Sequence, residues 1–231
     1  DAAAVKVTDT VNLTKVDDLR SDTTGNITIT SVTEGKVDLA TIDGYTDVIL
    51  STANITVSDD VSRGEAVTIN AYNNVSGTVT LTSITDSFTN VVAAQGTTGI
   101  AMTAATIETD NTEAVTKLNV ETLDGYTNGV VTVKSVRDTR TNIGLIDAMD
   151  DAKVVMNTAI VSVTDAVTKT QADDLNLLTG GQVTLESVED TNASILLIDG
   201  LKTSEVTMAA AAVKVTDKVN NAEVDTLDLK T

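Results

Sequence analysis

The feature that most constrains this chain is a six-residue stretch that returns four times at one spacing. Its copies alternate apolar and polar residues, end in Ser-Val or Ser-Ile, and cover residues 27–32, 79–84, 131–136 and 183–188. Their serines, at positions 31, 83, 135 and 187, are each 52 residues apart. A fixed spacing of this size is the signature of a repeat array. The alternation within each copy predicts a strand with one face buried.

Two further stretches recur in each period. One is a short alternating run that ends in an acid, at 5–9, 55–59, 161–165 and 213–217, with a worn copy at 107–110. The other lies at 48–53, 100–105, 154–159 and 206–211 and ends in alanine. The acidic run predicts a second strand. The alanine-ended run is compatible with a second narrow sheet or with a corner, and its small residues predict close backbone packing there (Ala53, Ala105, Ala159 and Ala211).

Helix-like segments separate these runs. Apolar residues recur three apart in residues 14–23, 142–151, 170–178 and 194–201, and residues 113–124 carry Ala114, Leu118 and Leu123. Thr14, Ser62 and Thr168 lie where a side-chain oxygen can cap a helix start. Gly44, Gly125 and Gly200 follow Ile-Asp or Leu-Asp pairs and are predicted to end helices by adopting a positive φ.

The order strand, short helix, strand, short helix, strand predicts an α/β fold. We expect a right-handed solenoid of strand–helix half-coils, with a parallel sheet along its long axis. The repeats are predicted at 1–53, 54–105, 106–159 and 160–211, with a partial repeat at 212–231. Residues 2–9 and 210–217 share the sequence AAAVKVTD. The expected partners are therefore further repeats or stacked copies of the chain.

Composition argues against several classes of function. The chain has no His and no Cys, which excludes Ser/His/Asp and Cys/His catalysis. Its adjacent acid pairs fall in turns, so we expect no enzyme, no catalytic residue and no cofactor-binding residue. The net charge of -19 disfavours binding to nucleic acid or anionic membranes, and no apolar run is long enough to span a bilayer. The one basic cluster is formed by Lys134, Arg137 and Arg140.

Recurrent acids are the candidate metal ligands. They stand at two places in the period, at the end of the acidic run and just after the six-residue stretch (Asp9, Asp59, Asp165 and Asp217; Asp86, Asp138 and Asp190). Stacked carboxylates would suit calcium, which takes oxygen ligands. The glycine-rich calcium nonapeptide and the EF-hand loop are missing. The alternative hypothesis, which does not exclude calcium, is that each acid caps the helix that follows it.

The combined pattern resembles a known class of repeats. V-x-V-T-D at 5–9 and 213–217, a short Ala/Leu helix, and V-T-x-x-S-V-x-D-T at 183–191 are similar to the degenerate repeat tracts of giant bacterial surface proteins, notably cyanobacterial ones, and of related phage fibres. The worn copy at 107–110 and Glu34-Gly35 depart from it. The resemblance implies an extracellular spacer, fibre or adhesin scaffold that contacts cell-surface components. A virion fibre and a calcium-dependent adhesion module are the alternatives. A polysaccharide lyase would need basic residues and aromatics in a groove.

Overall fold

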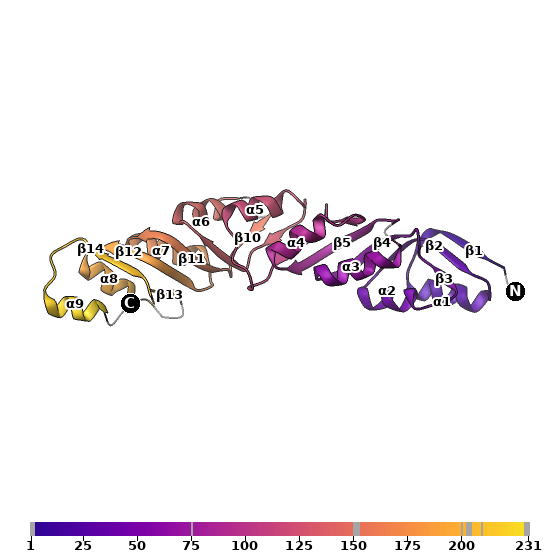
Figure 1. Ribbon diagram of the computed structural model, residues 1–231, viewed down its shortest axis with the longest axis horizontal. Helices are drawn as coiled ribbons and strands as arrows, with labels where there is room; N and C mark the ends of the chain where they lie inside the picture. The colour runs from indigo at the N-terminus through magenta and orange to yellow at the C-terminus, as the bar shows by residue number, and fades with distance from the viewer. Residues whose placement is uncertain are drawn as a thin grey trace. The chain divides into compact units, whose positions relative to one another are not determined.

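The computed structural model describes residues 3–74, 76–149, 153–199, 201, 205–208 and 210–228. The chain divides into two compact lobes. Lobe 1 comprises Asp1–Glu108 with Gly125–Val130, and lobe 2 comprises Thr109–Asp124 with Val131–Thr231. Both are built from strand–helix modules whose strands pair in parallel, as Figure 1 shows. The predicted α/β class is confirmed.

The elements follow one another in a regular order. Lobe 1 contains β1 (Val5–Val11), α1 (Leu13–Asp22), β2 (Ile27–Glu34), α2 (Lys36–Asp43), β3 (Val48–Ile49), β4 (Asn54–Val61), α3 (Arg63–Tyr72), β5 (Val79–Asp86), α4 (Phe88–Gln95) and β6 (Ile100–Ala101). The strand β7 (Thr106–Thr109) begins in lobe 1 and ends in lobe 2. Lobe 2 contains α5 (Lys117–Asp124), β8 (Val131–Thr132), β9 (Ser135–Asp138), α6 (Arg140–Asp147), β10 (Val154–Val155), β11 (Ile160–Val167), α7 (Lys169–Leu178), β12 (Val183–Asp190), α8 (Asn192–Asp199), β13 (Val206–Thr207), β14 (Ala212–Val215) and α9 (Asn221–Asp228).

Each alanine-ended run begins with a short strand that pairs in parallel with a strand of the six-residue stretch. In lobe 1, β2 pairs with β3 through Ile27 and Thr28, and with β4 through residues 31–34. In lobe 2, β12 pairs with β13 and β14 in the same way. The possibility of a second narrow sheet is therefore wrong at these strands. The chain turns between the short strand and the long one, and both lie along the same neighbouring strand.

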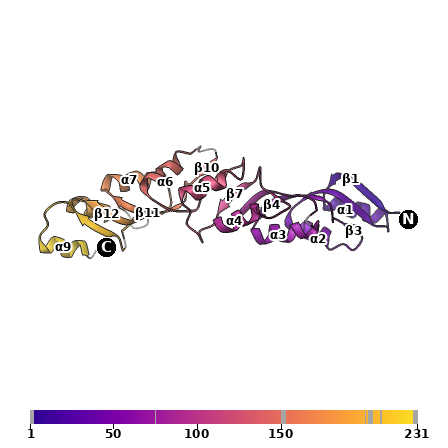
Figure 2. The same ribbon diagram turned by 45° about the horizontal axis from the view of Figure 1, so that its top comes forward.

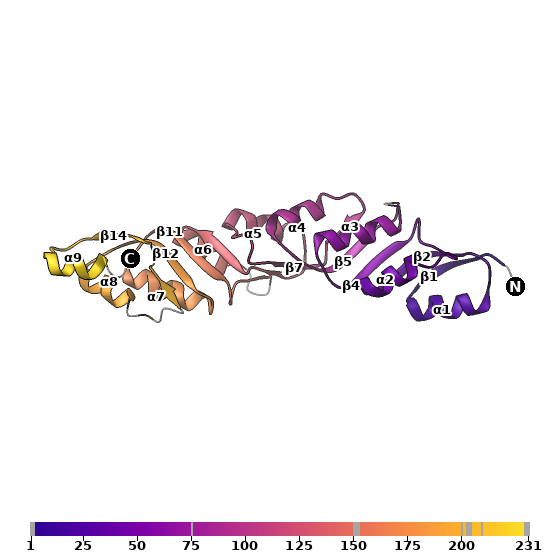
Figure 3. The same ribbon diagram turned by 60° about the horizontal axis from the view of Figure 1, so that its bottom comes forward.

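The core lies between the strands and a layer of helices. The inward pairs predicted from the alternation are fully buried in each copy (Ile27 and Ile29, Val79 and Leu81, Val131 and Val133, Val183 and Leu185). Helices pack against one another beside the strands, as Figure 3 shows for α1 to α4 and for α6 to α9. Each helix contributes one or two small or branched side chains, such as Val16 and Ile143. A layer this thin needs no aromatic residue.

Glycine and alanine meet where the backbones approach most closely. A Cβ on Gly77 would lie 1.9 Å from the carbonyl oxygen of Ala53, and one on Gly181 would lie 2.1 Å from that of Ala159. The same carbonyl accepts a hydrogen bond from the end of the preceding helix, since Thr179 Oγ1 donates to Ala159 O at 2.6 Å. The equivalent bonds involve Thr23 with Ala3, Asn73 with Ala53, and Thr127 with Ala105. The predicted close packing at Ala53, Ala105 and Ala159 is confirmed.

Helix ends depart from the prediction in several places. Ser62 and Thr168 are N-caps as expected, but α1 begins one residue earlier than predicted and is capped by Asn12 in place of Thr14. Gly44 follows α2 with a φ of −70°, so it needs no left-handed conformation. Among the described glycines, only Gly99 has a positive φ. Gly200 lies outside the described residues.

The worn third repeat also differs from the prediction. Helix α5 begins at Lys117, four residues after the predicted start at 113. Val115 instead continues the strand pattern, because it bridges to Val136 in parallel and its N–H donates to Ser135 O at 2.9 Å.

Candidate functional site

Three of the acids that end the acidic run, Asp9, Asp59 and Asp165, lie in β-bulges. In β4, Val57 lies opposite Leu81 and Asp60 opposite Ser83. Two residues of β4, Ser58 and Asp59, therefore face the single Thr82 of β5. The same register shift occurs in β1 between Val7 and Thr10 and in β11 between Val163 and Ala166. A bulge redirects the side chain that it carries. The bulge thus accounts for where Asp9, Asp59 and Asp165 point.

Three acids of this run cap a helix of the preceding module, Asp59 and Asp165 from their bulges and Asp217 from the residues that follow β14. Asp59 accepts from the first helical N–H of α2, at Lys36, with a distance of 2.9 Å. Asp165 accepts from Arg140 N of α6 at 2.6 Å, and Asp217 from Asn192 N of α8 at 2.8 Å. The first N–H groups of a helix lack internal partners, so these bonds satisfy exposed donors. Capping was predicted, but for the helix that follows; at these three acids the capped helix is the earlier one.

The acids after the six-residue stretch act on two helices. Asp86 accepts from Arg63 N of α3 at 2.9 Å and from Ser87 N, the N-cap of α4, at 2.8 Å. Asp138 accepts from Lys117 N and Thr139 N, both at 2.8 Å. Asp190 accepts from Lys169 N at 2.9 Å and Thr191 N at 2.7 Å. These acids therefore cap the earlier helix, and toward the following one they accept from the residue next to them, which at Ser87 and Thr139 is itself the N-cap.

Glu34 performs the same role and was missed by the sequence interpretation. Its Oε1 accepts from Leu13 N of α1 at 2.8 Å. Glu34 stands 52 residues before Asp86, so the repeat spacing alone would have identified it. The longer side chain reaches the helix where aspartate is lost.

These hydrogen bonds lower the pKa of the acids that act on two helices. Burial alone raises the pKa of Asp86, but hydrogen bonds from Asn90, Arg63 and Ser87 outweigh it and hold the pKa below its usual value. The pKa of Asp138 is lowered by the same balance. For Asp190 the N–H groups of the capped helices dominate, and burial is the lesser effect on its pKa. Each carboxylate is therefore stabilised in its charged form by the amides that it caps.

Calcium binding remains an open hypothesis for these acids. Six of the seven predicted ligands (Asp59, Asp86, Asp138, Asp165, Asp190 and Asp217) use carboxylate oxygens to accept backbone N–H groups. In the described part of the chain no three acidic side chains are gathered as a metal site. Asp9 is the exception, because it has no hydrogen-bond or ion-pair partner among the described residues.

The predicted basic cluster does not form a shared site. Arg137 pairs with Glu186, Nη2 to Oε2 at 2.7 Å, and Glu186 also accepts from Ser162 at 2.9 Å. Arg140 instead reaches toward Asp174 of α7, at 3.5 Å. Arg137 of β9 thus reaches across β11 to Glu186 of β12, whereas Arg140 joins α6 to α7, so the two side chains turn to different partners.

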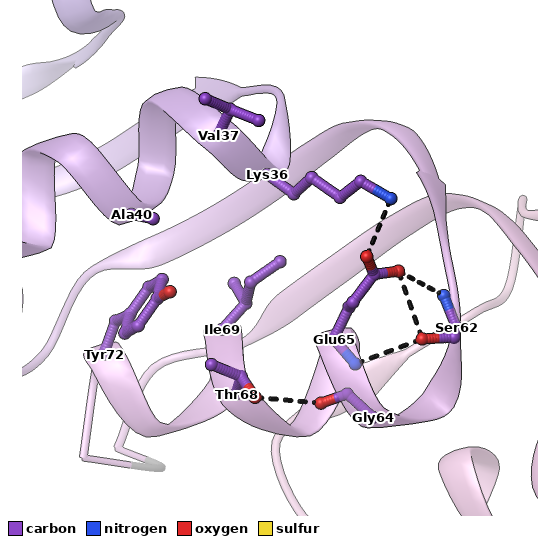
Figure 4. A pocket seen from close by; sticks show the side chains of 9 residues that line it. All are labelled: Lys36, Val37, Ala40, Ser62, Gly64, Glu65, Thr68, Ile69 and Tyr72. Atoms are coloured by element: carbon purple, nitrogen blue, oxygen red, sulfur yellow. Dashed lines mark hydrogen bonds and ion pairs between the residues drawn. The ribbon is translucent and has the colours of Figure 1, made fainter.

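A groove between α2 and α3 was not anticipated from the sequence. Figure 4 shows it, with Lys36 and Glu65 at one end and Tyr72 at the other. Its volume is about 560 Å³. The polar groups are already used: Lys36 Nζ pairs with Glu65 at 2.8 Å, and Glu65 completes the capping box of Ser62. The groove therefore presents mainly apolar surface, and its charged groups are paired with each other and with the helix start.

Comparison with known proteins gives no match: no family model, no characterised protein and no solved structure is similar to this chain. Within the residues that the structure describes, no helix has the length and apolar character needed to cross a membrane.

Proposed function

We propose that this chain is a non-enzymatic structural segment, a spacer in an extracellular surface protein, fibre or filament. The observation that supports it most is the recurrence of the same three contacts: parallel pairing, a carboxylate cap on the earlier helix, and a glycine against an alanine carbonyl. Residues that repeat in this way join modules to their neighbours. We therefore propose a right-handed solenoid with a period of 52 residues.

Because each module makes these contacts with the next, the length of the segment increases by a fixed amount for each added module. Each module is tied to the next by strand hydrogen bonds in the sheet and by a charged cap from the sheet to the helix layer. Sliding one module against the next would break both sets of bonds together. The net charge of -19 repels neighbouring chains and keeps such a segment extended and soluble.

An added repeat tests this proposal. Duplicating residues 54–105 in frame inserts the two long strands β4 and β5 together with the short β6. Each long strand extends the sheet by about 4.8 Å, so the particle should lengthen by roughly 10 Å. Small-angle X-ray scattering measures the maximum dimension. An unchanged dimension, with the extra residues unfolded by circular dichroism, would contradict the solenoid.

The bacterial cell surface is the location that we propose, on the resemblance to surface repeat tracts. A virion fibre is the alternative with the same mechanics. Antibodies against the chain distinguish the two: labelling of intact cells supports the surface, and labelling of purified phage particles alone supports the virion.

A calcium-dependent adhesion module is the second candidate function. The observation behind it is the recurrence of acids at two places in each period. A rise in melting temperature at millimolar calcium, lost in Asp9→Asn, is the expected result. An identical melting temperature with calcium and with chelator would refute it.

A further inference from the structure

One loop of lobe 1 places an asparagine directly before a glycine that the fold requires. Glycine recurs every 52 residues, at positions 25, 77, 129 and 181. A Cβ on Gly129 would lie 2.3 Å from Ala105 O, so a larger residue there forces the backbone to move. The residue before the glycine differs in each repeat (Thr24, Ser76, Asn128 and Gly180), and Asn128 is the only asparagine of the sequence that precedes a glycine.

An Asn-Gly pair is chemically labile. The backbone nitrogen of the glycine, once it has lost its proton, attacks the side-chain carbonyl carbon Cγ of the asparagine. The new N–Cγ bond closes a succinimide ring, the Cγ–Nδ2 bond breaks, and Nδ2 takes up a proton and leaves as ammonia. Water then opens the ring at either carbonyl, which gives aspartate or isoaspartate. Glycine favours the attack because it has no side chain, and asparagine is among the thermolabile residues.

The structure exposes the side chain that reacts and holds the nitrogen that must attack it. Asn128 is exposed, and its side-chain amide makes no hydrogen bond within the described part of the chain. Gly129 N, in contrast, donates to Thr127 Oγ1 at 2.8 Å, and this hydroxyl donates to Ala105 O at 2.6 Å. Asn128 N donates to Thr103 O at 2.8 Å. The nitrogen of Gly129 is therefore released only when its bond to Thr127 opens.

We infer that Asn128 is a site of spontaneous deamidation in the folded protein, and that opening of the bond from Gly129 N to Thr127 Oγ1 sets its rate. The reactants are the chain itself and water, so the modification requires no second protein. This inference goes beyond the proposed structural role and does not depend on it.

The two products differ in their effect on packing. Isoaspartate adds a methylene to the main chain directly before Gly129, which displaces this glycine from Ala105. The shift continues to Val130, whose carbonyl oxygen accepts from Ile107 N at 2.8 Å in β7, the strand labelled in Figure 2. Aspartate leaves the main chain unchanged and adds a negative charge. The isoaspartate form should therefore be the less stable of the two.

Incubation of the folded protein at neutral and at mildly alkaline pH tests the site, with the deamidated fraction at each asparagine located by mass spectrometry of a digest. We expect Asn128 to be modified at about ten-fold or more the rate of Asn111, which is also exposed but precedes the β-branched Thr112. The rate should rise with pH, because the glycine nitrogen must lose its proton. Faster modification at another asparagine would overturn the inference. So would an intact Asn128 under conditions in which the urea-unfolded chain is modified there.

Three variants provide the matched controls. Asn128→Ser reproduces the Ser76-Gly77 pair of the preceding repeat and should give no product at this position. Thr127→Val removes the acceptor of Gly129 N and should raise the rate about five-fold or more, the factor that corresponds to the net contribution of a hydrogen bond. Thr127→Ser keeps the hydroxyl and should react at nearly the original rate. Equal rates in the valine and serine variants would show that this bond does not set the rate.

Hydrogen exchange at the Gly129 amide checks the same step without a substitution. In urea below the unfolding transition, exchange at this amide and deamidation of Asn128 should increase together, because both require the bond to open. Deamidation that increases while the Gly129 amide stays protected would overturn the role of the bond.

Discussion

Gly181→Ala tests the closest approach in the fold of lobe 2. The added Cβ would lie 2.1 Å from Ala159 O and 2.8 Å from Thr158 O, so two backbone segments must separate by about 1 Å to reach ordinary contact. Overpacking of this kind costs about 1–3 kcal/mol. The movement also strains the bond from Thr179 Oγ1 to Ala159 O, worth about 1 kcal/mol. The lower entropy of the unfolded alanine chain offsets about 0.4–1 kcal/mol.

The net loss is about 2–3 kcal/mol, which for a chain of this length lowers the melting temperature by roughly 5–10 °C. Thermal melting followed by circular dichroism measures it. Gly144→Ala is the matched control, because its Cβ meets no atom within 4 Å in helix α6. Alanine stabilises a helix interior by about 0.5–1 kcal/mol relative to glycine, so this variant should melt higher. A Gly181→Ala protein as stable as Gly144→Ala would refute the steric argument.

Three further changes test the caps and the surface pair. Asp165→Ala removes the cap on α6 and should cost about 0.5–2 kcal/mol in urea unfolding, whereas Asp147→Ala, with the same charge change, should cost less. The pKa of Asp86 is lower in the folded protein than in the unfolded chain, where it is near 4. The carboxylate therefore contributes fully to the free energy of unfolding above about pH 4, and this contribution is lost as the pH falls through the folded pKa. Asp86→Asn should accordingly weaken the decline in stability at acid pH. Arg137→Ala breaks an exposed ion pair and should change stability by less than about 1 kcal/mol, with the difference vanishing in high salt.

Each of these three predictions has an outcome that would contradict it. Equal unfolding midpoints for the two aspartate variants would show that the cap from Asp165 to α6 does not contribute to stability. A steep acid transition retained in Asp86→Asn would assign the decline to other carboxylates. A loss of several kcal/mol in Arg137→Ala would mean that the pair organises the sheet.

The period of the sequence was sufficient to predict the strands. Ile27 and Ile29 alternate with threonine, and alternation can be satisfied only by burying one face of a strand. The close packing at Ala53 also followed from composition, since only small residues allow backbones to approach. Helix starts were less certain: Asn12 and Thr14 can both cap a helix, and the local sequence does not rank them.

What the sequence determined by itself was the set of positions that repeat: which residues are buried, which are small and which are acidic. Only the tertiary structure decided what the acids do. Asp59 lies 23 residues from the helix N–H that it caps at Lys36, and the bulge that aims it there exists only when β4 pairs with β5. A contact between modules depends on strand register, and register is set by the packing of neighbours, which no single strand encodes.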